Sequence, residues 1–145
     1  MSCKHITVTV LGANGTMGMN VSAIFASFGC AKVYMVSRNL EKSKVAAQRA
    51  GKTVKADSII NHLIPADYSM LSACVAESDL VFESAAEDLA LKMDLHTRVA
   101  ANLRADAIAC TGSSGLSITR LAECYPDPQR SHFFNLYHSF ECFYR

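Results

Sequence analysis

The chain contains 145 residues, a length that fits one domain with a single hydrophobic core. Half of the residues are hydrophobic and 19% are charged, and this balance excludes an intrinsically disordered protein. Lys and Arg total 14 against 13 for Asp and Glu, which gives a formal net charge of +1. Because no run of Lys and Arg forms a basic patch, the sequence argues against a nucleic-acid-binding protein.

The sequence also argues against a membrane or secreted protein. Its most apolar region, residues 21–36, is interrupted by Gly29 and Lys32 and is too short to span a bilayer. The first residues lead directly into a strand-like segment without the pattern of a signal peptide, so we expect a cytoplasmic protein. The six cysteines contain no Cys-x-x-Cys pair, which favours free thiols over a disulfide or zinc framework.

Strand and helix patterns alternate along the chain. The β-branched segment 6–11 predicts a first strand, and the apolar residues after it recur at helical spacing as far as Gly29, a C-cap candidate. Further strands are expected at residues 33–36, 59–65, 79–83, 107–110 and from 132, with helices at 40–51 (capped by Asn39), 68–76, 89–103 and 117–123. This alternation predicts a single α/β domain over residues 1–145, with a doubly wound, mostly parallel sheet of the Rossmann type.

A glycine-rich turn follows the first expected strand. Gly12, Gly15 and Gly18 have the spacing G-x-x-G-x-x-G, one residue longer than the usual dinucleotide fingerprint. Glycines here permit a tight turn, the approach of backbone to a pyrophosphate and close packing of helix on strand. The N–H groups at the start of the next helix favour phosphate. We therefore expect residues 12 and 14–18 to bind a dinucleotide, that is Gly12, Asn14, Gly15, Thr16, Met17 and Gly18.

The second expected strand ends in Ser37 and Arg38. Sites for NAD usually have an acidic residue at this place, which binds the 2′-hydroxyl of the ribose. A hydroxyl and a guanidinium can instead bind a 2′-phosphate through charge-assisted hydrogen bonds. The cofactor is thus NAD or NADP, and these two residues favour NADP over the alternative that Arg38 is an ordinary solvated side chain.

Three segments resemble the N-terminal nucleotide-binding domain of the 3-hydroxyacyl-CoA dehydrogenases. They are residues 79–92 (DLVFESAAEDLALK), 111–119 (TGSSGLSIT) and 132–135 (HFFN), in the family's order and approximate spacing. The resemblance implies oxidation of 3-hydroxyacyl-CoA in fatty acid metabolism, with a nicotinamide dinucleotide as partner. It also implies a C-terminal helical domain that closes the substrate site and forms a dimer, and that domain is absent from these 145 residues. Exposed apolar surface at the C-terminal edge then predicts self-association, with a homodimer as one form.

The resemblance also implies roles for single residues. His132 is similar to the catalytic base, which takes the proton of the alcohol, and Ser113 (or Ser114) to the serine between nicotinamide and substrate. Glu87 and Lys92 match positions at the ribose and nicotinamide end of the cofactor, and Asn135 matches a nicotinamide contact. Since these residues follow expected strands, we expect all of them at the carboxyl edge of the sheet.

Some residues have alternative interpretations. Lys92 has the spacing to pair with Asp88 on its own helix, and Glu83 is equally consistent with a site residue and a solvated acid. The other histidines, at positions 5, 62, 96 and 138, are interpreted as surface or packing residues. Two positions depart from the family pattern: Tyr144 stands where the family has the glutamate that orients the histidine, and Leu136 where it has a proline.

Three functions remain open at this point. The first is a dehydrogenase domain whose isolated chain binds cofactor with little turnover. The second is a binding module that holds NAD(P) without catalysis. The third is another kind of NADP-dependent reductase, although no tyrosine is followed four residues later by the lysine that such enzymes use for proton transfer.

Overall fold

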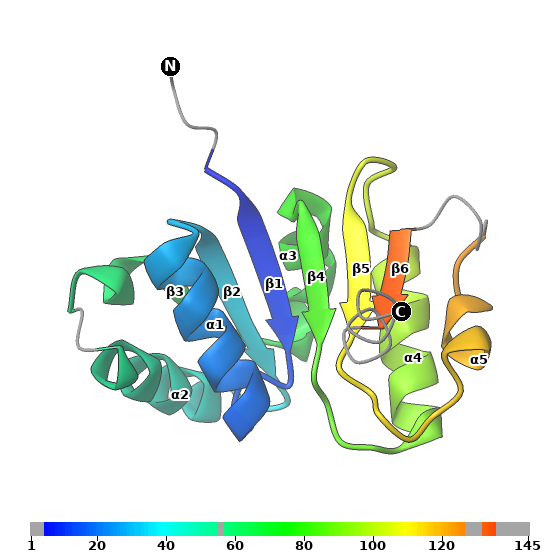
Figure 1. Ribbon diagram of the computed structural model, residues 1–145, viewed down its shortest axis with the longest axis horizontal. Coiled ribbons are helices and arrows are strands. Elements are labelled where there is room, and N and C mark those ends of the chain that lie inside the picture. The colour runs from blue at the N-terminus through cyan, green and yellow to red at the C-terminus, as the bar shows by residue number, and fades with distance from the viewer. Residues whose placement is uncertain (1–4, 55–56, 127–131, 136–145) are drawn as a thin grey trace, which may run out of the picture.

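The computed structural model describes residues 5–54, 57–126 and 132–135, which build a parallel sheet of six strands. The strands are β1 (Thr7–Leu11), β2 (Lys32–Ser37), β3 (Leu63–Asp67), β4 (Leu80–Glu83), β5 (Ile108–Thr111) and β6 (His132–Asn135). Their order across the sheet is β3-β2-β1-β4-β5-β6 (Figure 1). This is the order of a Rossmann fold, so the predicted fold class is confirmed.

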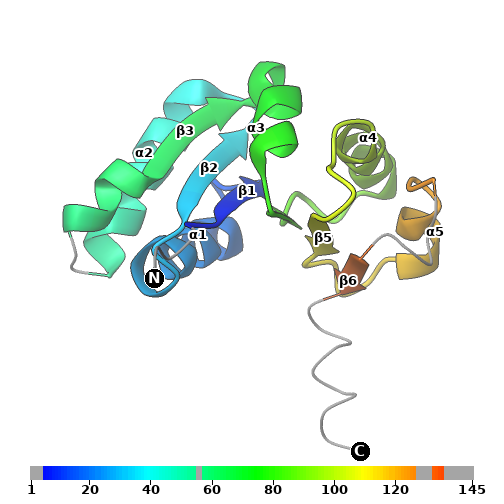
Figure 2. The same cartoon turned by 90° about the horizontal axis from the view of Figure 1, so that it is seen from above.

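Helices connect the parallel strands. They are α1 (Thr16–Phe28), α2 (Leu40–Thr53), α3 (Leu71–Glu77), α4 (Leu89–Ala100) and α5 (Ile118–Ala122). Side chains of α1 and α2 pack with β1 and β2 in one core, and side chains of α3 and α4 pack with β4 and β5 in a second core. Helices α1 and α2 cover one face of the sheet and α3 and α4 the other (Figures 1 and 2), so the two cores lie on opposite faces.

The predicted elements agree with the structure to within two residues, with three larger differences. One is the helix predicted over residues 68–76, where Tyr68–Met70 form a 3-10 helix and α3 begins only at Leu71. The third strand occupies residues 63–67 rather than 59–65, because Asp57–His62 form a 3-10 helix before it. Helix α4 ends at Ala100, three residues before the predicted end. The predicted caps are present: Asn39 accepts a hydrogen bond from the Lys42 N–H, and Gly29 follows α1.

Helix α1 buries its small residues. Gly18, Ser22, Ala23 and Ala26 face the sheet, whereas Phe28 remains 85% exposed and Met17 and Ile24 are also exposed. Part of its apolar side borders a groove of about 330 Å³. This apolar groove is lined by Val21, Ile24 and Phe25 of α1 and by Leu80, Phe82, Ile108 and Cys110 of β4 and β5. The helical spacing of the large apolar residues thus predicts the helix correctly, but these residues do not form its buried face.

Two further expectations concern the described residues. Cys30, Cys74, Cys110 and Cys124 are free thiols. No helix in this part of the chain is both long enough and apolar enough to pass through a bilayer.

Candidate functional site

The turn after β1 requires glycine at two positions. Gly12 has φ of +73°, and a Cβ there would lie 2.4 Å from the carbonyl oxygen of Ser84, which follows β4. A Cβ on Gly18 would lie 2.5 Å from the carbonyl oxygen of Gly12, so the first turn of α1 packs directly on the turn. The sequence folds into this tight connection because only glycine tolerates these approaches and the positive φ.

The start of α1 is open to an anion. Its N-cap is Gly15, no side chain caps the helix, and no acidic residue lies in the first turn. Thr16 and Met17 are exposed there. Uncapped N–H groups and the positive end of the helix dipole together favour a phosphate at this position.

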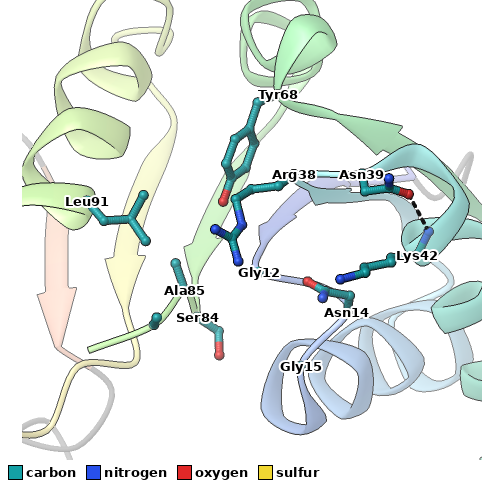
Figure 3. A pocket seen from close by; sticks show the side chains of 11 residues that line it. Gly12, Asn14, Gly15, Arg38, Asn39, Lys42, Tyr68, Ser84, Ala85 and Leu91 are labelled. Carbon is teal, nitrogen blue, oxygen red and sulfur yellow. Dashed lines mark hydrogen bonds between the residues drawn. The ribbon is translucent and has the colours of Figure 1, made fainter. Parts of the chain in front are cut away.

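A pocket of about 320 Å³ opens where the strand order reverses between β1 and β4. Open α/β sheets bind ligands at this switch point, outside the carboxyl ends of the strands. This switch-point pocket is lined by residues from four parts of the chain: Gly12, Asn14 and Gly15; Arg38, Asn39 and Lys42; Tyr68; and Ser84, Ala85, Ala86 and Leu91 (Figure 3). Its volume lies within the range of small-molecule sites.

One end of the switch-point pocket is basic. Arg38 and Lys42 both line it, and in Figure 3 the Arg38 side chain lies beside the Tyr68 ring while Lys42 extends toward Asn14. Ser37 does not belong to this lining. It is 1% exposed, and its hydroxyl lies 2.7 Å from the Ser43 hydroxyl and 2.9 Å from the Asn39 carbonyl oxygen, either of which it can donate to. The structure therefore corrects the prediction that Ser37 faces a ligand.

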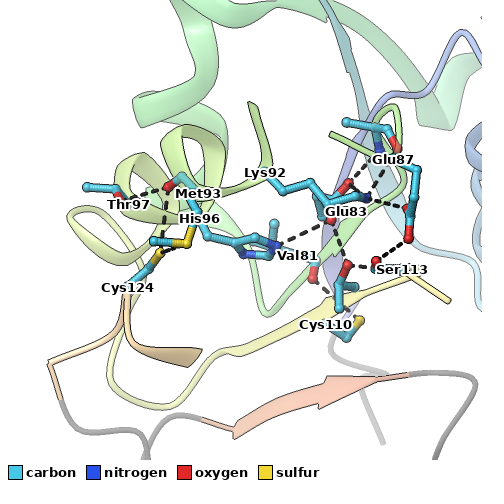
Figure 4. A network of polar contacts seen from close by, with 12 residues as sticks. Val81, Glu83, Glu87, Lys92, Met93, His96, Thr97, Cys110, Ser113 and Cys124 are labelled. Carbon is cyan, nitrogen blue, oxygen red and sulfur yellow. Dashed lines mark hydrogen bonds and ion pairs between the residues drawn. The ribbon is translucent and has the colours of Figure 1, made fainter. Parts of the chain in front are cut away.

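Beyond the other end of the pocket, five residues form a closed set of polar contacts, which we call the polar ring (Figure 4). Lys92 Nζ lies 2.7 Å from Glu83 Oε1 and 3.5 Å from Glu87 Oε2. The Ser113 hydroxyl donates to Glu87 Oε1 at 2.5 Å, and the Ser113 N–H donates to Thr111 Oγ1 at 3.1 Å. Thr111 Oγ1 closes the ring by donating to Glu83 Oε2 at 2.6 Å.

Glu83 is the centre of these contacts. It is 0% exposed, and it also accepts from the Ala85 N–H at 2.5 Å. Burial alone would raise the pKa of Glu83, but hydrogen bonds from His96, Lys92 and Thr111, with the charge of Lys92, outweigh burial and lower the pKa to about 2. A carboxylate with this many donors stays ionised and fixes the side chains around it.

His96 connects Glu83 to a buried tyrosine. Its Nε2 lies 3.3 Å from Glu83 Oε2, and its Nδ1 lies 2.8 Å from the Tyr125 hydroxyl. Both distances fit one neutral tautomer, in which Nε2–H donates to Glu83 and Nδ1 accepts from Tyr125. Burial raises the pKa of Tyr125, which keeps its hydroxyl a donor.

Glu87 reaches from the polar ring toward solvent. Its Oε1 accepts from the N–H groups of Ser114 and Gly115 at 3.2 and 3.0 Å, in addition to the Ser113 hydroxyl. Slight burial raises the pKa of Glu87, but the bonds from Ser113 and Gly115 and the charge of Lys92 give a net decrease. A negative side chain therefore fixes the loop that follows β5.

Comparison with known proteins identifies the family. The family model described as "3-hydroxyacyl-CoA dehydrogenase, NAD binding domain" matches residues 7–141, most of the chain. The chain belongs to this family. Its cofactor is therefore a nicotinamide dinucleotide, NAD(P), and the glycine turn and switch-point pocket stand where such a domain needs them.

Individual relatives support the assignment. An L-carnitine dehydrogenase from Burkholderia mallei is 40% identical over 78 residues, which cover 54% of this chain and 23% of that protein. A 3-hydroxybutyryl-CoA dehydrogenase from Clostridioides difficile is 29% identical over 144 residues, which cover 88% of this chain and 49% of that protein. The structure of 3-hydroxybutyryl-CoA dehydrogenase from Escherichia coli superimposes with a TM-score of 0.75 at 26% identity, over 92% of this chain and 29% of that one. The chain spans less than half the length of each of these relatives.

The family domain brings together three of the residues singled out in the sequence. Glu87, Lys92 and Ser113 meet in the polar ring, although they come from the β4–α4 loop, α4 and the β5–α5 loop. The carboxylate partners of Lys92 are Glu83 and Glu87, while Asp88 caps α4 by accepting from the Leu91 N–H. Lys92 is 1% exposed, so it lies behind the surface of the site.

Strand β6 begins at His132, as predicted, but this places His132 away from the carboxyl edge of the sheet. His132 begins the strand and is in register with Ile108, and Asn135 ends it in register with Thr111. Asn135 is therefore at the carboxyl edge, as expected, but His132 is three residues away along the strand, about 10 Å by the rise of a parallel strand. Sequence order could place the strand but not its register, which is set by pairing with β5. Leu136, His138 and Tyr144 lie outside the described residues.

Sequence reasoning missed several residues of the site. The sequence interpretation of His96 is a surface or packing residue, and it assigns no role to Thr111 or Tyr125. In the structure His96 and Thr111 form buried hydrogen bonds to Glu83, and Tyr125 bonds His96. Lys42 was also missed, although it lies in the first turn of the helix that follows the strand end singled out in the sequence. The side-chain partners of Glu83 are 9 to 28 residues away in the chain, so no local pattern reveals them.

Proposed function

We propose that this chain is the NAD(P)-binding part of an enzyme that transfers hydride between C3 of a 3-hydroxyacyl-CoA and a nicotinamide cofactor. The observation that carries the proposal is the polar ring. It lies at the carboxyl ends of β4 and β5, and its residues come from two of the sequence segments that resemble this family. The relatives named as 3-hydroxybutyryl-CoA and L-carnitine dehydrogenases support a secondary alcohol as the reacting group.

The residues present suit a dinucleotide. The turn at Gly12 and the uncapped start of α1 would hold the pyrophosphate, with Asn14, Gly15 and Thr16 around it. The basic end of the switch-point pocket would hold the adenosine, and the other end would hold the nicotinamide. When bound, the nicotinamide ring supplies the hydride chemistry.

The polar ring would orient groups on the nicotinamide side. Ionised Glu83 holds the buried ammonium group of Lys92, and Lys92 in turn holds Glu87. Glu87 fixes the hydroxyl of Ser113 and the backbone of the loop after it. A serine fixed in this way can position a substrate oxygen without further ordering at the moment of reaction.

The proton of the alcohol requires a base, and the proposed base is His132, as the resemblance implies. The pairing of β6 with β5, however, places His132 away from the carboxyl edge of the sheet, and this favours a second candidate function. With His132 level with Ile108, the chain by itself would be a binding module that holds NAD(P) with little or no turnover. Both candidates share dinucleotide binding and differ only in catalysis.

A binding titration and an activity assay on the purified chain test the proposal. We expect NADH or NADPH to bind, and we expect slow reduction of acetoacetyl-CoA that Ser113→Ala and His132→Gln abolish. The matched control is Ser114→Ala, whose side chain is exposed and should matter little.

Dinucleotide binding without any measurable reduction would favour the binding module. Failure of both dinucleotides to bind would contradict the proposed function altogether. Reduction at the rate of a complete enzyme would contradict only the expectation of little turnover.

A further inference from the structure

Two cations at the basic end of the switch-point pocket have no acidic partner in the described part of the chain. Arg38 directly follows β2, and Lys42 lies in the first turn of α2. Both side chains are exposed, both line the pocket, and neither forms a salt bridge with a described residue. Unpaired positive charges that converge on one pocket favour an anionic ligand.

Acidic side chains near this end are bound elsewhere. Glu41 pairs with Lys44 of the same helix at 2.7 Å. Asp67, next to Ser37 in the register of β3, accepts from the N–H and the hydroxyl of Ser69, at 2.9 and 2.5 Å. Neither carboxylate lines the switch-point pocket, so no described acid is there to accept a hydrogen bond from a ribose 2′-hydroxyl.

The position that would carry such an acid is filled by Ser37, which points inward. Its hydroxyl bonds Ser43, and Ser43 in turn donates to the Ala66 carbonyl oxygen at 2.8 Å. The end of β2 is thereby tied to α2 and β3 by neutral groups. The charge that reaches the pocket from this edge is positive, and the N-terminus of the 14-residue helix α2 adds the positive end of its dipole.

We propose that Arg38 and Lys42 form a subsite for a phosphate monoester on the adenine-side ribose, so that the chain binds NADP(H) in preference to NAD(H). The inference rests on the dinucleotide binding proposed above. A 2′-phosphate carries close to two negative charges and offers three acceptor oxygens, which suits one guanidinium and one ammonium group. The guanidinium can bind two of these oxygens in parallel, and the ammonium group supplies a second point charge from the next helix.

The test compares ligands with and without the 2′-phosphate. Titration of the chain with NADPH and NADH measures the preference, which we expect to be about tenfold or more. A second pair of ligands, 2′,5′-ADP and 5′-AMP, repeats the comparison with the adenosine half of the cofactor alone. Binding of these two nucleotides is measured on the unchanged chain and does not depend on catalysis. The preference should decrease with added salt, because exposed charges are screened.

Variants assign the effect to residues. Arg38→Ala and Lys42→Ala should each weaken NADPH binding about tenfold and leave NADH binding nearly unchanged. The matched control is Lys52→Ala, which removes one positive charge from the far end of the same helix and should change neither affinity.

The outcomes separate the inference from the function on which it rests. Equal affinities for NADH and NADPH, or equal losses of both in Arg38→Ala, would overturn the 2′-phosphate subsite while dinucleotide binding stands. Failure of all four ligands to bind would overturn both. A preference for NADPH and 2′,5′-ADP that only the Arg38 and Lys42 variants remove supports the inference.

Discussion

Glu83 is a buried acid that stays ionised because neighbouring side chains donate hydrogen bonds to its carboxylate. Lys92, Thr111 and His96 all point toward its two oxygens. In an unfolded chain the same carboxyl group would be solvated and would have its ordinary pKa. The difference between the two states makes Glu83 a source of stability that depends on pH.

The pKa of Glu83 predicts that the protein loses stability in acid. In the folded protein the pKa is about 2, against 4.5 for the free group. A lowered pKa stabilises the fold above the unfolded value, and this contribution is lost as pH falls from about 4.5 toward 2. We expect a decrease on the order of 3 kcal/mol in the free energy of unfolding, measured by urea denaturation at a series of pH values.

Two variants identify Glu83 as the cause. Glu83→Gln should be less stable at pH 7, because the buried ammonium group of Lys92 loses its nearest carboxylate, and its stability should depend less on pH below about 4.5. Glu77→Gln, which alters an exposed glutamate with a lowered pKa, should keep most of the acid dependence. An equally steep decrease in Glu83→Gln and in the unchanged protein would contradict the assignment.

At the residue scale, sequence reasoning found the right segments but not all the right partners. Glu87, Lys92 and Ser113 were selected by resemblance, and they do lie together. Ser37 was selected by its place after a strand, yet its side chain points inward to Ser43. The direction of a side chain at a strand end depends on helix packing, which neighbouring residues in the sequence do not reveal.

At the scale of elements, helix α1 packs on the sheet through small residues. Ala23 and Ala26 lie in the core beside the valines of β1 and β2. Small side chains let the helix approach the sheet closely, and this places its first turn directly on the turn at Gly12. Packing density at this contact therefore supports the geometry of the phosphate-binding turn.

Substitutions in α1 test this packing. Ala23→Leu should destabilise the protein by about 1–3 kcal/mol, because extra methylene groups overpack a filled contact. Phe28→Ala, at a position that is 85% exposed, should change stability by less than about 0.5 kcal/mol. Urea denaturation measures both, and the reverse order of effects would mean that the helix packs through its large residues.

Sequence patterns predicted strands and caps well because these depend on neighbouring residues. The β-branched run of β1 and the cap at Asn39 are local features, and both appear where expected. The buried face of α1 and the register of β6 depend instead on what packs against each element. For this reason the start of the last strand at His132 was predicted correctly, whereas the expected position of His132 at the carboxyl edge was wrong.

At the scale of the whole molecule, the pocket exists because the strand order changes direction. Connections from β1 run to β2 and β3 on one side, and β4, β5 and β6 extend the sheet on the other. The loops after β1 and β4 separate at this point and leave room for a ligand. Alternating strands and helices were sufficient to predict the fold. Of the two cations at the basic end of the pocket, Arg38 was expected from the sequence, whereas Lys42 required the structure.

A ligand at this position should stabilise the whole domain. Dinucleotide at 100 times its Kd should raise the free energy of unfolding by about 2.7 kcal/mol, because it binds the folded chain and not the unfolded one. Thermal denaturation with and without ligand measures the effect as an increase in Tm. As a control, Arg38→Ala should show a smaller increase with the same concentration of NADPH. No change in Tm at saturating ligand would contradict binding to the native fold.

The closed geometry of the polar ring has a consequence for how this protein tolerates change. Each of its five residues forms a hydrogen bond or ion pair with the next. Substitution of one residue therefore leaves a buried polar group of its neighbour without a partner. The same atoms therefore contribute both to folding and to ligand placement. A single substitution in the polar ring is expected to lower stability as well as to change how the site positions its ligand, so the stability of each such variant has to be measured beside its activity.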